Sequence, residues 1–300
     1  MSISVVVNTV SLGGLDMLFN SLAEQVDSPP FEVVLVDEWY DHRGQLVFER
    51  VGDEFFTARG FKVKHVPVVK KQPFRDDCNG WNTGLRAAEG ELICFLTDYN
   101  WVYPAYLEDH WRIYKACPGY SMIGYCDRYP WPRTATTIYG DGDLWWTAFA
   151  QEMTPERAAY YFSHVDPVYH ERRGNYRGPA VAGTQYNELP GNLYYAGLNE
   201  SIPLAVLKEL NGWDERYDGG YASCDVDIGV RANMLGWKFL LNPTVTCRIG
   251  QASTPRPVKT VVKPQLRTPE ENYAMFQHRV AAISAQAEMV RVPVGWGCWE

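Results

Sequence analysis

The sequence predicts an α/β protein with a mostly parallel central sheet flanked by helices. Short, largely apolar runs alternate with helical stretches along the N-terminal third of the chain. These runs lack the polar alternation of half-exposed strands, as expected of parallel strands buried on both faces. Several of them end in polar residues, and ligands bind to α/β sheets at the carboxyl ends of the strands.

The first elements follow one another in a regular order. The expected strands are 3–7, 32–36, 63–66 and 92–96, and the expected helices are 15–25, 44–55 and 78–88. Asn8 and Thr9 follow the first strand, Asp37 follows the second, and Asp98 follows the fourth. Because the carboxyl ends of parallel strands share one edge of a sheet, these four residues predict a ligand site there.

The second half of the chain has a looser pattern. Residues 120–195 are rich in aromatic side chains, Gly and Pro, which suits either a stacking platform for a ligand or a satellite core. A short helix is expected at 204–210, a strand at 239–241 and a proline-interrupted tail at 254–263. Residues 268–271 form a capping box that opens a C-terminal helix. Its apolar positions are Tyr273, Phe276, Val280, Ile283, Ala287 and Val290.

Docking of this C-terminal helix on its own domain is favoured, and a homodimer contact is the alternative. The 300 residues are 46% hydrophobic, enough for one large domain. Seven cysteines without a C-x-x-C pair, beside six histidines, disfavour a zinc site or disulfide scaffold. With no apolar run of membrane-spanning length and no charged front of a signal peptide, the expected location is cytoplasmic.

A glycine-rich stretch organises the second half. Gly219, Gly220 and Tyr221 precede Asp225 and Asp227, which stand where a helix is expected to begin. Two glycines let a backbone approach a ligand closely, and the helix dipole favours charged carboxylates. These aspartates are therefore candidates for a general base or a ligand clamp. The alternative is an N-cap followed by an acid in the first helical turn.

Charge is unevenly distributed although the chain carries a net charge of −8. No acidic residue lies between Asp227 and Glu270, so a local anion site is plausible there. The basic residues of this interval are Arg231, Lys238, Arg248, Arg256, Lys259, Lys263 and Arg267.

A series of motifs in sequence order resembles those of the family 2 glycosyltransferases. Ser21-Leu22-Ala23-Glu24-Gln25 resembles S-L-x-x-Q, and Val34-Leu35-Val36-Asp37-Glu38 resembles a strand ending in V-V-D-D. Residues 82–91 resemble N-x-G-x-x-x-A-x-G-E, and residues 95–100 stand where the family has F-L-D-x-D-D. Residues 212–215 and 224–231 resemble G-F-D-E and E-D-x-D-L-x-x-R. The resemblance covers most of 1–115 and 196–250.

This resemblance implies a GT-A fold, with a Rossmann-like sheet in a single catalytic domain over residues 1–250. Residues 1–115 would form the nucleotide-binding half, 116–195 an aromatic-rich insertion, and 196–250 the acceptor and base half. A tail and C-terminal helix over 251–300 would complete the chain.

The implied activity is inverting transfer of a sugar from a nucleoside-diphosphate sugar to an acceptor hydroxyl. Asp225 matches the general base of inverting members. The acceptor stays open among a glycan, a lipid-linked sugar, a protein and a modified base. The implied donor-binding residues are Asn8, Thr9, Asp37, Asn82, Asp98 and Arg248. The implied acceptor-binding residues are Gly219, Gly220, Tyr221 and Asp227.

The metal-binding D-x-D motif of the family is altered to Thr97-Asp98-Tyr99, with Asn100 behind it. A Mg²⁺ or Mn²⁺ ion would be held by Asp98 and Asn100, or Arg248 would neutralise the diphosphate without an ion.

Two alternative functions remain. The altered D-x-D motif also suits a non-catalytic nucleotide- or sugar-binding module, although the presence of Asp225 favours an enzyme. The basic interval suits a glycosyltransferase that acts on a modified nucleobase in DNA, but the net negative charge argues against that acceptor.

Overall fold

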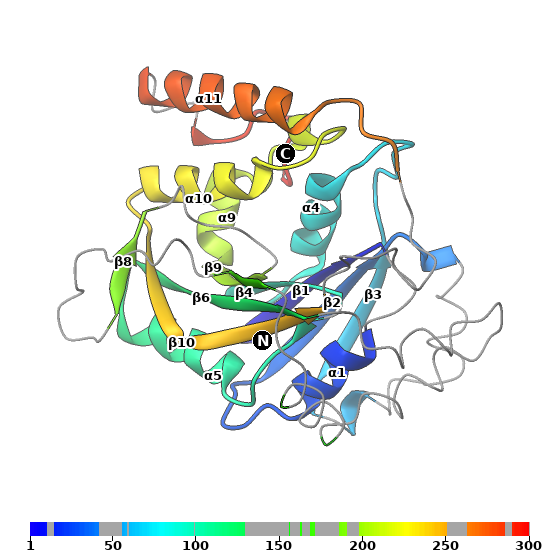
Figure 1. Cartoon of the computed structure of the whole chain (residues 1–300), viewed down its shortest axis with the longest axis vertical. Helices are drawn as coiled ribbons and strands as arrows, with labels where there is room; N and C mark the ends of the chain where they lie inside the picture. The colour runs from blue at the N-terminus through cyan, green and yellow to red at the C-terminus, as the bar shows by residue number, and fades with distance from the viewer. Residues whose placement is uncertain are drawn as a thin grey trace.

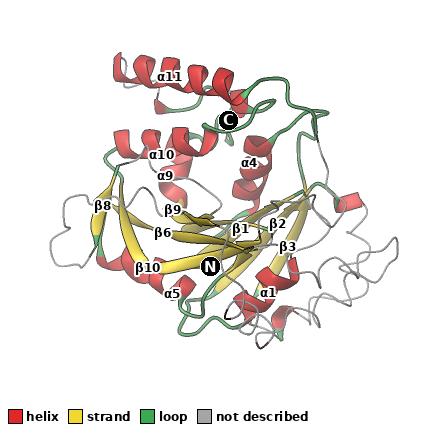
Figure 2. Ribbon diagram, in the orientation of Figure 1, coloured by secondary structure: helices red, strands yellow, loops and turns green. Residues whose placement is uncertain are grey.

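The computed structural model describes ten segments of the chain and the single residues 156 and 163. The segments are 1–10, 15–41, 56–58, 60–98, 100–129, 169–171, 186–190, 198–250, 263–285 and 290–299. A central sheet lies between two layers of helices, and a further helix covers one of these layers (Figures 1 and 2).

The sheet has the strand order β3-β2-β1-β4-β9-β6-β10-β5, with β7 (Tyr169–Glu171) paired to β6 and β8 (Asn187–Leu189) paired to β10. Its first half is parallel and confirms the four strands expected from the N-terminal part of the sequence. Most of their residues are buried because helices cover both faces. These strands are β1 (Ile3–Thr9), β2 (Phe31–Asp37), β3 (Lys62–Pro67) and β4 (Leu92–Thr97).

The second half makes the sheet mixed rather than mostly parallel. β9 (Leu198–Pro203) pairs antiparallel with β4, and β6 (Tyr120–Tyr129) pairs antiparallel with β9. β10 (Lys238–Gly250) is parallel to β6 and pairs at its end with the short β5 (Asn100–Trp101). The start of the expected insertion at 116–195 is therefore a strand of the central sheet. The boundaries of that insertion remain a prediction.

Helices α1 (Leu15–Ala23) and α5 (Tyr106–Ala116) cover one face of the sheet (Figure 1). Helices α4 (Asp77–Ala87), α9 (Leu204–Leu210) and α10 (Cys224–Met234) cover the other. These positions confirm the helices expected at 15–25, 78–88 and 204–210. The helix expected at 44–55 lies outside the described residues.

Alternation along β1 divides the core between the two faces. Val5 and Val7 pack in the cluster with α1 and α5, whereas Val6 packs in the cluster with α4. A Cβ atom added to Gly84 of α4 would lie 2.3 Å from Cγ1 of Val6. The glycine of the N-x-G motif is thus required for close packing of α4 on the sheet.

Helix α11 (Pro269–Ala285) forms the outer layer over α10 (Figure 1). Its expected capping box is confirmed, since the Thr268 N–H donates to Glu271 Oε2 at 2.7 Å. The expected docking on the domain is also confirmed, but the buried face is partly polar and includes Asn272 and Arg279 beside Ile283. Tyr273 was wrongly placed on that face, because it is 53% exposed. Ala287 lies outside the described residues. Homodimerisation stays a prediction.

Among the described residues, no helix combines the length and the apolar character needed to cross a membrane.

Candidate functional site

The polar ends of the parallel strands meet at one edge of the sheet, as the sequence predicted. Thr9 lies opposite Asp37 in the register of β1 and β2. The Thr9 hydroxyl donates a hydrogen bond of 2.9 Å to Oδ2 of Asp98, which joins the end of β1 to the end of β4. Asn8 precedes this junction and packs against α4, where a Cβ atom on Gly80 would lie 2.4 Å from its Nδ2 atom. The Asn8 Oδ1 atom is buried without a hydrogen bond from any described residue.

The carboxylate of Asp37 is held on both oxygens. Oδ1 accepts the N–H of Trp39 at 2.8 Å, and Oδ2 lies 2.8 Å from Nε2 of His65 in β3. The side chains of Asp37 and His65 are both fully buried. A nucleotide can therefore reach the Asp37 carboxylate only if the residues that cover it move. His65 was not among the predicted residues. The feature that could have revealed it is a histidine inside a strand that pairs with the fully buried β2.

A basic residue from the tail closes the same edge of the sheet. The Lys263 ammonium lies 2.7 Å from Oε1 of Glu38, directly after β2, and 2.5 Å from Oδ1 of Asp76, before α4. Burial raises the pKa of Glu38, the ion pair with Lys263 opposes that rise, and the nearby Asp76 carboxylate adds to it. The sequence placed Lys263 in a basic interval but gave no sign of its partners.

The glycine-rich loop is fixed by contacts within the protein. Gly219 has φ +89°, and its carbonyl accepts the N–H of Leu266 at 2.6 Å. A Cβ atom on Gly220 would lie 2.4 Å from the amide atoms of Asn272 in α11. The two glycines thus have structural reasons, and their expected contact with an acceptor stays a prediction. Tyr221 is 50% exposed beneath the Arg75 guanidinium, so its proposed contact with an acceptor stays a prediction.

Two left-handed residues lead into α10. Ala222 has φ +70° and Ser223 has φ +73°, a conformation that costs free energy in any residue other than glycine. Asn272 of α11 donates a hydrogen bond to the Ala222 carbonyl at 3.3 Å and so helps to hold the turn. Asp225 then lies half-buried in the first turn of α10. The N-cap position belongs to Ser223, so neither Asp225 nor Asp227 is an N-cap, but both lie in the first turn as that alternative expected.

Asp227 does not face an acceptor, which corrects its assignment. Its carboxylate is 1% exposed and lies 2.6 Å from Nε of Arg231 and 3.0 Å from Nε of Arg279 in α11. The fully buried Arg231 also donates to the carbonyls of Leu210 and Gly212. These motif residues therefore join α9, α10 and α11.

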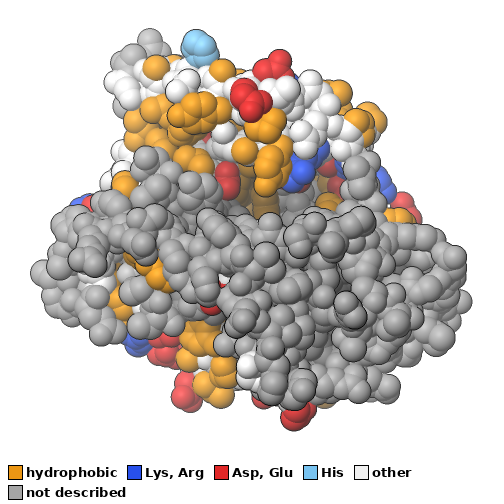
Figure 3. All heavy atoms as spheres, in the orientation of Figure 1, with side chains coloured by type: hydrophobic (Ala, Val, Ile, Leu, Met, Phe, Trp, Pro, Cys, Tyr) orange, Lys and Arg blue, Asp and Glu red, His pale blue; other side chains and the backbone are white. Residues whose placement is uncertain are grey.

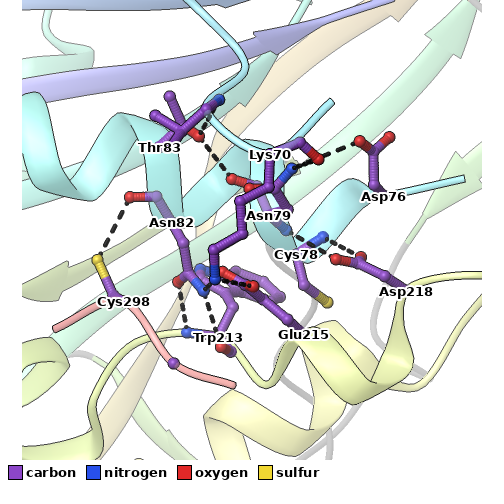
Figure 4. A network of polar contacts seen from close by, with 12 residues as sticks. Lys70, Asp76, Cys78, Asn79, Asn82, Thr83, Trp213, Glu215, Asp218 and Cys298 are labelled. Atoms are coloured by element: carbon purple, nitrogen blue, oxygen red, sulfur yellow. Dashed lines mark hydrogen bonds and ion pairs between the residues drawn. The ribbon is translucent and has the colours of Figure 1, made fainter. Parts of the chain in front are cut away.

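Asn82 is likewise a brace and offers no exposed atom to a donor. Its side chain exchanges hydrogen bonds of 2.8 and 2.9 Å with the backbone of Trp213 (Figure 4). It also donates to Oε1 of Glu215 at 3.0 Å, and Glu215 is paired with Lys70 at 2.8 Å. Asn82 thereby connects the motif at 82–91 to the motif at 212–215.

Of the two predicted metal ligands, Asp98 and Asn100, only Asp98 fits a divalent ion. Asn100 is fully buried, and its Oδ1 accepts the Thr97 hydroxyl at 2.9 Å, so it does not fit as a ligand. Asp98 is half-buried and fits a Mg²⁺ or Mn²⁺ ion that takes its other ligands from water and phosphate. No group of three or more His, Cys, Asp or Glu residues suited to a metal occurs in the described part of the chain. Arg248 lies in β10 opposite Trp101 of β5, and Trp101 follows Asp98 by three positions in the sequence.

A parallel half with polar strand ends, joined to a mixed half, defines an α/β fold of the GT-A-like type. The chain superposes on S. aureus TarS with a TM-score of 0.54 and 15% identity over 95% of this chain and 40% of that one. It also superposes on residues 1–349 of S. aureus TarS in complex with UDP-GlcNAc, with a TM-score of 0.53 and 15% identity over 96% and 69% of the two chains. This chain thus spans less than half of the longer TarS chain. No protein-family model and no curated protein matches the sequence.

Proposed function

We propose that this protein is a glycosyltransferase that moves a sugar from a nucleoside-diphosphate sugar to an acceptor hydroxyl with inversion. The GT-A-like fold and the polar strand edge support this class of transferase. The complex of TarS with UDP-GlcNAc makes UDP-GlcNAc the first donor to test. The acceptor is a hydroxyl of a glycan, a lipid-linked sugar, a protein or a modified base.

The observation that carries the proposal is the position of Asp225. Its carboxylate is half-buried in the first turn of α10, after a strained turn held by α11. Strained backbone conformations concentrate at functional sites. In the proposed reaction, Asp225 takes the proton of the acceptor hydroxyl while the oxygen of that hydroxyl bonds to the anomeric carbon. The bond from that carbon to the diphosphate oxygen breaks on the opposite face, which inverts the configuration.

The remaining site residues act on the donor. Asn8 and Thr9 would contact the nucleotide, and Asp37 would accept hydrogen bonds from its base or ribose after local movement. A divalent ion at Asp98, when bound, would supply positive charge against the diphosphate. Arg248 is the alternative source of that charge.

A panel of nucleoside-diphosphate sugars tests the proposal. Thermal stabilisation and donor hydrolysis are measured with and without Mn²⁺, for the wild type and for Asp225→Asn. One donor should stabilise both proteins, and the variant should lose turnover. Failure of every donor to bind would refute the proposal.

The burial of Asn100 favours one competing function, a non-catalytic nucleotide-sugar-binding module, because it leaves the altered D-x-D motif with a single fitting carboxylate. Stabilisation by a donor without turnover under any metal condition, with acceptors of all four classes supplied, would support that module instead.

A further inference from the structure

A hollow of about 450 Å³ opens beside the N-terminal half of α4 and helix α11. Its volume lies within the range of small-molecule pockets. Neither Asp225 nor any of the strand-end residues of the donor site lines it. The residues used below are Lys70, Phe74, Asn79, Glu215, Met275 and Trp296, which come from four separate parts of the chain.

The walls of this hollow are partly aromatic and apolar. Phe74 is half-buried, and Trp296 is 50% exposed. Met275 adds an apolar surface from α11. Hydrophobic side chains also gather over α10 and α11 on the face drawn in Figure 3. Aromatic rings beside an open hollow suit a ligand with an apolar face and polar edges.

One polar atom in the wall needs a donor. Asn79 is 1% exposed, and its Nδ2 atom donates to the Lys70 carbonyl at 2.9 Å. Its Oδ1 atom has no hydrogen-bond partner among the described residues. Figure 4 shows Asn79 beside Lys70 in the first turn of α4, where the Asp218 carboxylate accepts the backbone N–H groups of Cys78 and Asn79. A buried amide oxygen without a donor costs free energy, which a ligand hydroxyl would recover.

The charged groups around the hollow have partners within the protein. Arg267 donates to the Asn272 amide oxygen and to the carbonyls of Arg216 and Asp218. Lys70 lies 2.8 Å from Glu215, and Arg216 lies 2.6 Å from Asp214. Burial raises the pKa of Asp218 to about 8, and the backbone N–H groups of Cys78 and Asn79 oppose that rise. Because these charged groups are engaged within the protein, a neutral ligand with several hydroxyl groups matches the hollow better than an ionic one.

We propose that this hollow binds a neutral saccharide unit, with Phe74 and Trp296 against its C–H face and Asn79 accepting one hydroxyl. The unit is either part of an acceptor glycan or a free sugar. Binding here requires neither the nucleotide nor Asp225, so it stands or fails separately from the proposed transferase activity.

Ligand-observed NMR and calorimetry test the proposal with N-acetylglucosamine, glucose, galactose and their short oligosaccharides. The wild type should bind at least one of them, and Trp296→Ala should weaken that binding roughly tenfold through the lost aromatic contact. Tyr273→Ala is the matched control, because Tyr273 is a similarly exposed aromatic residue outside the hollow. It should bind like the wild type, as should Asp225→Asn.

Phe74→Ala provides a second test on a different segment, in case Trp296→Ala unfolds. Binding of monosaccharides would identify a free-sugar site, and binding of oligosaccharides alone would identify an acceptor subsite. The proposal would be overturned if no saccharide binds, or if Trp296→Ala and Phe74→Ala both bind as tightly as the wild type. Displacement of the saccharide by UDP would overturn it as well.

Discussion

His65 and Asp37 form a fully buried pair, with Nε2 of the histidine 2.8 Å from Oδ2 of the aspartate. The pair joins β3 to the end of β2, at the edge proposed to bind the nucleotide. It also decides how a substitution at Asp37 should be interpreted, because the loss of this carboxylate leaves a buried histidine without its partner.

Asp37→Ala should weaken nucleoside-diphosphate binding by about tenfold or more and lower the free energy of unfolding by about 1–3 kcal/mol. Calorimetric titration and urea denaturation measure the two effects. His65→Gln serves as the control for the structural part. An unchanged dissociation constant in a folded Asp37→Ala protein would remove Asp37 from the donor site.

Asp225→Asn should reduce turnover by roughly 10²–10⁴-fold while donor binding persists, since a positioned general base contributes that much. Steady-state kinetics and donor titration check this outcome. Glu209→Gln, an exposed change at the end of α9, is the control and should behave like the wild type. Near-normal turnover of Asp225→Asn would falsify the role.

Arg231→Met should lower the free energy of unfolding by about 3–5 kcal/mol, because it leaves the buried Asp227 carboxylate with one arginine fewer. Lys238→Met, which breaks the partly exposed pair with Glu188, should cost less than about 1 kcal/mol. Chemical denaturation compares the two variants. Equal losses would show that the Asp227 network contributes no more than a surface pair.

The fold should lose stability in mild acid through His110. The imidazole is fully buried between Ser201 and Asn199, at 2.9 and 3.2 Å, and burial lowers the pKa of His110 to about 4. Between about pH 6.5 and pH 4 the unfolded chain binds a proton that the folded chain does not. Stability is therefore complete above about pH 6.5 and falls as the pH drops toward 4.

His110→Gln should lack this component of the pH dependence, which amounts to about 3 kcal/mol at its largest. Denaturation curves at several pH values between neutrality and pH 4 measure the difference between wild type and variant. A difference that stays constant across this range would contradict the assignment.

Turnover should fall in excess EDTA and return with Mn²⁺, and Asp98→Ala should raise the Mn²⁺ concentration required. Asn100→Ala should change stability but not the metal requirement, because its buried oxygen bonds to Thr97. Activity assays across a range of Mn²⁺ concentrations distinguish the two variants. Full activity in EDTA that is lost in Arg248→Ala would instead support charge neutralisation by the arginine.

The sequence by itself determined the parallel half of the sheet and its polar edge. Consecutive apolar residues in β1, β2 and β4 are a local signal, and residues that end such strands must share one edge. That rule predicted that Thr9 and Asp98 share an edge, and the structure adds the hydrogen bond between them. The helix that begins near Asp225 and the capping box of α11 were also readable, because caps and helical periodicity are local.

Only the tertiary structure decided which polar residues are engaged within the protein. Lys263 reaches Asp76 across 187 positions of sequence, and Asn82 reaches Trp213 across 131. No periodicity encodes such pairs. Asp225 and Asp227 have similar sequence surroundings, yet one is half-buried at a strained turn and the other is covered by two arginines. Burial and charge pairing, which arise when distant elements pack, separate a candidate base from a structural anion.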